Sequence, residues 1–424
     1  MGKVSLRGWT AGLRNSFHLA LGCVLAFGFA LSGSGSYAAK APQSSEVPST
    51  TIDTAPFGFV RPGELYLTLH YSMVSLDFID DGHLLFTFQK KGLLRHTADE
   101  QPDDDDQLIH AVVIDIATGK ETASADWRMH DKERYLWPLG NGRFLVRQRD
   151  TISITGSTLQ LQSYGRFPGH LVALQVAAGG SLLVAETVEP DKLSAAPPED
   201  PVSTEFLGTR SKPIVLRILR IEDRAVLARS RSARPIILPV NTTGFLQTFE
   251  GDKEGQWELS FTALNRGEDG KTPEAKPFAE ISSACAPTVW FLSPEALISV
   301  RCKPSNDKLA TVLSLDGKLL WERKWPSREL ATSILSSPDG TRFAHSTLLT
   351  GGPSLTSMSD ISGQKVEVFS TATGRPLLTV PAFPVYDVGG NYTFSPDGKR
   401  FAVIHEGAIK IYDLPAEGNQ TAAR

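Results

Sequence analysis

The stretch Phe394-Ser-Pro-Asp-Gly-Lys-Arg-Phe-Ala-Val403, followed by Ala408-Ile-Lys-Ile-Tyr-Asp-Leu414, carries the clearest structural signal in this chain. Its Asp-Gly pair indicates a tight hairpin turn, because glycine adopts the positive φ angle of such turns without steric cost. The apolar segments after the turn have the length and composition of strands. The stretch therefore predicts consecutive antiparallel strands joined by short turns.

The same unit recurs along the chain. The segment Ser336-Ser-Pro-Asp-Gly-Thr-Arg-Phe-Ala344 repeats the first half of the pattern. Comparable turns, each followed by a short apolar strand, occur at Asp81-Gly82, Asn141-Gly142, Gly179-Gly180, Thr243-Gly244, Ser293-Pro294, Asp339-Gly340 and Asp397-Gly398. In each unit a third strand follows and ends in a second turn, as at Thr118-Gly119 and Thr373-Gly374. Each unit thus supplies about four strands.

The last unit resembles a repeat of the WD40 or YVTN type, with Tyr412-Asp413 where a Trp-Asp pair often stands. The resemblance implies an all-β fold, a β-propeller of seven four-stranded blades. Six or eight blades stay open, because the second and fourth units match the pattern weakly. The resemblance implies little about function, because this fold hosts unrelated activities.

The ends of the repeat region predict how the ring closes. The last unit has three strands, and the alternating segment Glu64-Leu-Tyr-Leu-Thr-Leu-His70 precedes the first unit without a partner. Placed as the outer strand of the last blade, it would remove two exposed sheet edges. The alternative is an independent strand packed over one face of the disc.

The N-terminal segment has the pattern of a secretory signal peptide. Lys3, Arg7 and Arg14 precede the apolar run Phe17 to Leu31, and small residues follow up to Ala38. The run has 15 residues, whereas a membrane helix needs about 20. We therefore expect cleavage near Ala38 or Ala39, with the uncleaved anchor as the alternative.

These signals divide the chain into a signal peptide (1–38), a flexible leader (39–60), a single propeller domain (61–415) and a disordered tail (416–424). The product would be secreted or periplasmic. Cleavage removes three basic and no acidic residues, so the formal charge moves from −4 to −7. An acidic protein has no general attraction to nucleic acid or anionic lipid.

Two cysteines remain after cleavage, Cys285 and Cys302. Strands are expected over Pro287 to Leu292 and Ala296 to Arg301, and folding about the Ser293-Pro294 bond would place the two cysteines opposite each other. An oxidising compartment would let them form a disulfide. Two buried free thiols are the alternative. Such a bridge is structural, because the Cys-x-x-Cys spacing of redox catalysts is absent.

Few patterns in the sequence indicate catalysis. The Gly-x-Ser-x-Gly pentapeptide that propeller peptidases carry in their hydrolase domain is absent. The nine histidines form no metal-binding motif; His345 and His405 could approach the central channel, but a buried, hydrogen-bonded role fits them better. Leu315 to Trp325 is similar to the repeat of quinoprotein propellers, yet Trp321 stands nearly alone and is expected to pack against the neighbouring blade. No catalytic residue, metal or cofactor is assigned.

The insertions that differ between units are Asp99 to Gln107, Glu189 to Pro213 and Gly351 to Gly363, all expected as exposed loops. Recognition usually resides in such loops. We therefore expect a monomeric binding scaffold for a protein or other extracellular ligand. The alternative is an extracytoplasmic enzyme, lactonase-like or quinoprotein-like, with its site at the mouth of the central channel.

Overall fold

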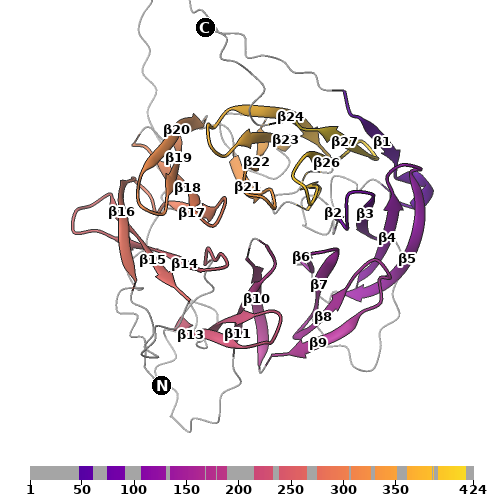
Figure 1. Cartoon of the computed structure of the whole chain (residues 1–424), viewed down its shortest axis with the longest axis horizontal. Coiled ribbons are helices and arrows are strands. Elements are labelled where there is room, and N and C mark those ends of the chain that lie inside the picture. The colour runs from indigo at the N-terminus through magenta and orange to yellow at the C-terminus, as the bar shows by residue number, and fades with distance from the viewer. Residues whose placement is uncertain are drawn as a thin grey trace, which may run out of the picture.

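The chain forms a ring of small antiparallel sheets (Figure 1). The computed structural model describes residues 47–60, 74–90, 107–129, 134–167, 169–177, 179–188, 214–232, 238–264, 275–304, 307–325, 330–350, 361–383, 385 and 390–416. The expected signal peptide 1–38 lies outside these ranges. Within them the only helix is the short 3-10 turn η1 (Ala55–Phe57), and no helix is long and apolar enough to cross a membrane.

Seven sheets make up the ring, which confirms the predicted seven-bladed propeller. Blade 1 consists of β2 (Val74–Phe78), β3 (His83–Gln89), β4 (Gln107–Asp115) and β5 (Lys120–Met129); blade 2 of β6 (Leu136–Gly140), β7 (Arg143–Gln148), β8 (Thr151–Thr155) and β9 (Gln162–Arg166); and blade 3 of β10 (His170–Val176), β11 (Leu182–Val188), β12 (Ile214–Arg220) and β13 (Val226–Ser232). Blade 4 consists of β14 (Gly244–Glu250), β15 (Gln256–Ala263) and β16 (Lys276–Ser282), and blade 5 of β17 (Thr288–Phe291), β18 (Ala296–Cys302), β19 (Lys308–Ser314) and β20 (Leu319–Trp325). Blade 6 consists of β21 (Leu330–Ser336), β22 (Arg342–Thr350), β23 (Ile361–Ser370) and β24 (Pro376–Ala382), and blade 7 of β25 (Tyr392–Phe394), β26 (Arg400–His405), β27 (Ala408–Asp413) and β1 (Thr50–Asp53).

Blade 4 departs from the four-stranded pattern. It has three strands, and the place of its innermost strand is taken by a segment joined only through an isolated bridge between Val240 and Phe245. The turn that follows is closed by Asn241, whose side-chain oxygen accepts hydrogen bonds from the amides of Thr243 and Gly244. This blade corresponds to one of the units that match the repeat weakly.

The ring is closed by an N-terminal strand in the last blade, as predicted, but by a different segment. Strand β1 pairs antiparallel with β27, from Thr50 opposite Ile411 to Asp53 opposite Ala408. The expected closing strand, Glu64 to His70, lies outside the described residues. Strand β1 belongs to the stretch 39–60 that we expected to be a leader, and it contributes the buried side chain of Ile52.

The hydrophobic core lies between the blades. Seven clusters of buried apolar side chains fill the seven junctions between neighbouring blades. At the junction of blades 5 and 6, for example, Phe343 and Phe369 stack at 5.2 Å and pack against Val312. Burying one such ring contributes about 2–3 kcal/mol. Each sheet is therefore stable only between its two neighbours.

The repeated Ser-Pro-Asp-Gly turn links successive blades. In blade 7 the Ser395 hydroxyl donates to Asp397 (2.6 Å) and accepts from the amide of Arg400 (2.8 Å). Gly398 has φ +68° and lies so close to Asp339 of blade 6 that a Cβ would approach its carboxylate to 3.0 Å. Glycine is therefore required there both by conformation and by the contact with the preceding blade.

An arginine after each of these turns reaches the next blade. Arg342 of blade 6 donates to the carbonyl oxygens of Gly398 (2.7 Å) and Pro415 (2.9 Å). Arg400 of blade 7 donates to the carbonyl oxygen of Asp81 in blade 1. The motif that made these two units recognisable in the sequence thus also holds the closing blade between its neighbours.

Trp321 packs across a blade junction, as expected. It lies on β20, the outer strand of blade 5, and its indole nitrogen donates to the Thr371 carbonyl oxygen of blade 6 (2.7 Å). Its ring stacks on Phe343 at 6.0 Å. Trp127 on β5 does the same at the junction of blades 1 and 2, donating to the carbonyl oxygen of Leu159 (3.2 Å).

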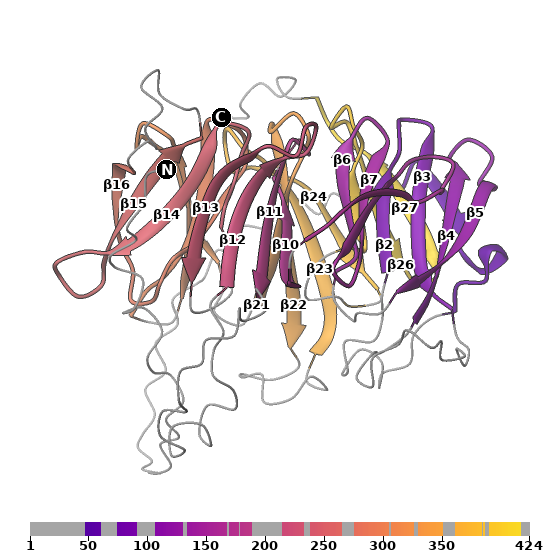
Figure 2. The ribbon, with the colours of Figure 1, turned by 90° about the horizontal axis from the view of Figure 1, so that it is seen from below.

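The two faces of the disc differ in their connections (Figure 2). We call the turn face the one that carries the turns between first and second strands, such as 79–82 and 395–399. The opposite, insert face carries the connections from β3 to β4, β11 to β12 and β22 to β23. The three predicted insertions fall on these connections. Two of the expected loops were drawn too long, because Gln107 already belongs to β4 and residues 361–363 already belong to β23.

Candidate functional site at the centre of the ring

Buried polar side chains gather in the half of the disc near the insert face. Near the turn face each second strand contributes buried apolar residues, such as Leu84 and Phe144, and six of the seven carry buried polar residues further along. Apart from Arg342 at the turn-face end of β22, the buried polar residues of these strands are Thr87, Arg147, Glu186, Thr187, Gln247, Ser299, His345, Ser346 and Thr347. A fold that needed only stability would continue the apolar packing, because a buried polar group costs free energy unless it is paired.

A polar cluster lies on the innermost part of the junction between blades 1 and 2. On β2, Val74, Leu76 and Phe78 pack toward blade 7, so Ser75 and Asp77 point to the other side, toward blade 2. There the hydroxyl of Tyr135, which immediately precedes β6, hydrogen-bonds the Thr87 hydroxyl. Blade 2 thereby meets blade 1 through polar contacts at the inner edge.

Asp77 is the unusual member of this cluster. Its side chain is buried, and the Ser75 hydroxyl donates to its Oδ2 (2.7 Å). Within the described part of the chain, no second hydrogen bond reaches the carboxylate. Burial raises the pKa of Asp77 from 3.8 to about 6, although the Ser75 hydrogen bond and the charge of Arg134 act in the opposite direction. At neutral pH the residue is thus an ionised carboxylate that destabilises the fold.

Arg134 immediately precedes Tyr135 and strand β6 of blade 2. Its Nε donates to the carbonyl oxygen of Leu136 (3.1 Å), and its guanidinium carbon lies 5.6 Å from the ring centre of Trp137. The side chain therefore extends back along β6 from the insert-face end. It is exposed to solvent, yet enclosure by protein lowers its pKa, against the charges of Asp77 and Tyr392.

Blades 6 and 7 contribute hydroxyl groups from the other side. Tyr392, at the start of β25, hydrogen-bonds Ser333 of β21 (2.5 Å) and also Ser346. Behind it, Gln364 donates to Ser346 (2.6 Å) and accepts from Asn391 (2.8 Å). Burial raises the pKa of Tyr392, so its hydroxyl stays protonated. This network fixes the position of the phenol.

We call Ser75, Asp77, Arg134, Ser333 and Tyr392 the central site. The charge of Arg134, just before blade 2, lowers the pKa of Asp77 in blade 1 and of Tyr392 in blade 7. The site offers a carboxylate, a guanidinium and hydroxyls to a ligand. Elsewhere among the described residues, no group of three His, Cys, Asp or Glu side chains is arranged to hold a metal ion.

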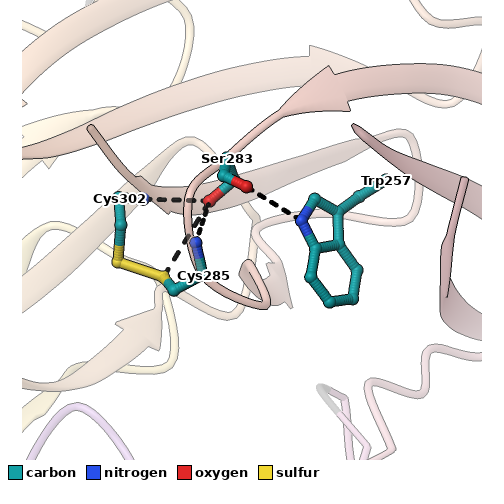
Figure 3. The surroundings of a disulfide bond; sticks show 4 residues. All are labelled: Trp257, Ser283, Cys285 and Cys302. Atoms are coloured by element: carbon teal, nitrogen blue, oxygen red, sulfur yellow. Dashed lines mark hydrogen bonds between the residues drawn. A yellow bond between two sulfur atoms is a disulfide. The ribbon is translucent and has the colours of Figure 1, made fainter. Parts of the chain in front are cut away.

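The disulfide between Cys285 and Cys302 is present, with the Cα atoms 5.5 Å apart (Figure 3). The predicted register was wrong by one position: Thr288 pairs with Val300 and Phe291 with Leu297, so the hairpin folds about residue Pro294. The Ser293 hydroxyl causes this by accepting the amides of Glu295 and Ala296. Cys285 consequently lies outside the ladder, in the connection between blades 4 and 5.

Ser283 connects this disulfide to blade 4. Its hydroxyl accepts the Cys302 amide (3.0 Å), and its carbonyl oxygen accepts the indole N–H of Trp257 on β15 (3.0 Å). In Figure 3 the serine lies between the tryptophan of blade 4 and the two cysteines. The bridge is therefore a structural fastening of the three-stranded blade to blade 5, distant in the ring from the closing strand.

The two histidines singled out in the sequence do not take part in the central site. His345 is buried and stacks on Trp325 of blade 5 at 3.8 Å. Burial, with the charges of Lys365, Lys308 and Arg323, lowers its pKa to about 3. The expectation that it is hydrogen-bonded was wrong, because neither ring nitrogen has a partner within the described ranges. His405 ends β26, with its Nε2 3.6 Å from Glu406.

Sequence reasoning missed Asp77, Arg134 and Tyr392. The one available signal was the aspartate in Val74-Ser-Leu-Asp-Phe78, a charge inside an otherwise apolar strand. Arg134 precedes its strand and had no pattern of its own. The site is assembled from separate blades, so no local motif could reveal it.

Comparison with known proteins finds distant structural likeness only. No family model and no curated protein matches the chain. Among solved structures, acylaminoacyl peptidase from Pyrococcus horikoshii matches at 10% identity and TM-score 0.47, over 84% of this chain and 53% of the peptidase. This chain thus spans about half the length of the peptidase chains it matches. A chain of the mitotic checkpoint complex matches at 10% identity and TM-score 0.34, over 91% of this chain and 100% of that one. A eukaryotic initiation factor matches at 11% identity and TM-score 0.37, over 78% and 72%.

Proposed function

We propose that this protein is an exported, monomeric binding scaffold that takes up its ligand at the central site, approached from the insert face. The export rests on the N-terminal pattern of Lys3, Arg7 and Arg14 before an apolar run. The binding role rests on Asp77. A carboxylate whose ionised form costs stability is retained where function requires the charge.

The surroundings of the site support this proposal. The buried polar groups of most second strands lie toward the insert face, where the three insertions leave the disc, whereas Asp77, opposite Leu85, lies nearer the turn-face end of β2. The turn face, by contrast, uses its polar side chains in turns and blade contacts, as Ser395 and Arg342 show. A ligand that enters from the insert face meets Arg134 before it reaches Asp77.

An enzyme at the same place is the alternative. With its pKa of about 6, Asp77 could act as a general base near neutral pH. The two functions differ in what happens to the ligand. A binding protein releases it unchanged, whereas an enzyme returns a product of different mass or structure.

Photo-crosslinking at matched positions tests the binding site. A benzophenone amino acid replaces Arg134 in one variant and the exposed Arg143, at the turn face of the same blade, in another. In cells that export the protein, we expect adducts at position 134 and none at 143, detected by mass spectrometry of the purified chain. Equal labelling at both positions, or labelling at 143 alone, would contradict the proposal.

A further inference from the structure

Blade 4 is packed less tightly than the closing blade. It has three strands and no full inner strand. The aromatic side chains on its strands are all half-buried, whereas those on the strands of blade 7 are all buried. The half-buried side chains are Phe245, Phe249, Trp257, Phe261 and Phe278, and the buried ones are Tyr392, Phe394, Phe401 and Tyr412. An element with less buried apolar surface opens locally at a lower cost in free energy than the rest of the fold.

Blade 4 is joined to blade 5 near both faces of the disc. At the turn face, the Asn241 side-chain amide donates to the Pro294 carbonyl oxygen (3.2 Å). At the insert-face end of β18, the bridge from Cys285 reaches Cys302. There the amide of Ala284 also donates to the Cys302 carbonyl oxygen (3.0 Å), beside the contact of the Ser283 hydroxyl with the Cys302 amide. The disulfide is the covalent part of this insert-face joint.

The disulfide is accessible to a reductant. Both cysteines are half-buried, so each has some contact with solvent. A thiolate of a dithiol can attack one sulfur, form a mixed disulfide with it and release the other cysteine. The second thiol of the reductant then displaces the first cysteine. Two electrons and two protons pass to the cysteines, and the dithiol becomes a disulfide.

We propose that the Cys285–Cys302 bridge is a redox-sensitive switch, whose reduction by a dithiol opens the insert-face side of the junction between blades 4 and 5. The hydrogen bonds of Ser283 and Ala284 remain after reduction, but each adds little net stability because water competes for the same groups. The Asn241 contact at the turn face and the pairing of β1 with β27 are left intact. The opening is therefore local, and the ring stays closed.

Hydrogen–deuterium exchange of the purified protein, read by mass spectrometry at pH 7.5, tests the switch. The oxidised protein is compared with protein reduced by dithiothreitol without denaturant. We expect the amides of β14, β15 and β16 to exchange at least about tenfold faster after reduction, because the bridge no longer restricts the open state of blade 4. The amides of blade 7 should change by less than about twofold. Equal acceleration in both blades, no acceleration in blade 4, or a bridge that resists dithiothreitol would overturn the proposal.

Two variants separate the bridge from its hydrogen bonds. The double variant Cys285→Ser, Cys302→Ser should exchange like the reduced parent protein, with or without dithiothreitol. Ser283→Ala keeps the bridge and removes the hydroxyl, so exchange in blade 4 should stay within about threefold of the oxidised parent. If Ser283→Ala accelerated exchange as much as reduction does, the hydroxyl would be the fastening and the proposal would fail. The comparison of oxidised and reduced parent protein decides even if the double variant does not fold.

A switch must also close again. After removal of dithiothreitol, oxidised glutathione should restore the bridge and return exchange in blade 4 to its original rate. Protection that does not return would contradict a switch. This inference goes beyond the proposed binding role and uses no residue of the central site. Crosslinking at position 134 and exchange in blade 4 therefore test the two proposals separately.

Discussion

The same local contact occurs at the turn face and at the centre of the ring, with opposite electrostatic results. Ser395 donates to Asp397 at 2.6 Å, and Ser75 donates to Asp77 at 2.7 Å, in both cases to the residue two positions on. Partial burial would raise the pKa of Asp397, but the Ser395 hydroxyl and the Lys399 amide outweigh it and hold that pKa low. Asp77 lacks such an amide, and its pKa is raised.

The difference shows that the short motif does not determine what an aspartate does. At the turn face the ionised carboxylate receives donors, closes a hairpin and stabilises the fold. In blade 1 the same residue type is buried with one hydrogen-bond donor, Ser75, and its ionised form destabilises the fold. The turn-face carboxylate of Asp397 is thus well supplied with donors, whereas the buried carboxylate of Asp77 has a single one.

The largest expected effect separates two arginines. Arg342→Met should lower the free energy of unfolding by about 3 kcal/mol, because one buried and one partly buried carbonyl oxygen lose a charged donor. Arg134→Met should cost less than about 1 kcal/mol, because the exposed guanidinium makes one hydrogen bond. Urea unfolding curves of both variants measure the difference. Equal losses would remove the distinction between the two regions.

The next effect is a gain in stability. Asp77→Asn should raise the free energy of unfolding by about 2–3 kcal/mol above pH 6, because the folded pKa of about 6 exceeds the unfolded value of 3.8. The destabilisation by Asp77 develops as pH rises from 3.8 to 6, so the gain should shrink toward zero near pH 4. Urea unfolding at pH 7.5 and pH 4 measures it. A gain that does not change with pH would argue against an ionised Asp77.

A smaller effect compares the two serines. Ser395→Ala removes the donor to Asp397 and the acceptor of the Arg400 amide, so we expect a loss of about 1–2 kcal/mol. Ser75→Ala removes one hydrogen bond and should cost less, while raising the pKa of Asp77 further. Thermal unfolding of the pair gives the stabilities, and carboxyl titration by NMR gives the pKa. A larger loss for Ser75→Ala would reverse the comparison.

The smallest expected effect is that of Asp397→Asn, and its sign is opposite to that of Asp77→Asn. Asp397→Asn should lower stability by up to about 1 kcal/mol at neutral pH, because the carboxylate accepts hydrogen bonds from Ser395 and from the Lys399 amide. Since the folded pKa lies below the unfolded one, this stability is present above pH 3.8 and is lost only on further acidification. Urea unfolding of Asp397→Asn beside Asp77→Asn measures both effects. If Asp397→Asn raised the free energy of unfolding, the two carboxylates would not differ in their effect on stability.

The blade pattern could be predicted from sequence because each turn is a local decision. A glycine with positive φ, an Asp or Asn beside it and an apolar strand after it suffice to place a hairpin, as at Asn141-Gly142. The closing strand could not be chosen in this way. Glu64 to His70 alternates more regularly than Thr50 to Asp53, yet only contact with β27 decides which segment pairs.

For the same reason the disulfide could be predicted from the sequence and the central site could not. The cysteine pair lies within one hairpin, and its partner was predictable even though the Ser293 hydroxyl shifted the register. Asp77, Arg134 and Tyr392 come from blades 1, 2 and 7, and they meet only because the ring closes. Proximity of this kind arises from the tertiary structure and leaves no trace in the spacing of residues.

Strand β1 has a consequence for how the molecule is made. It is the first strand of the described residues, and its partner β27 is the last of them, so the circle cannot be completed until synthesis of blade 7 is finished. Joining positions so far apart costs chain entropy that no earlier contact offsets, which makes this step slow. The Cys285–Cys302 link joins positions only 17 apart and can form beforehand. An exported chain would therefore emerge with its blades formed in sequence and its circumference still open.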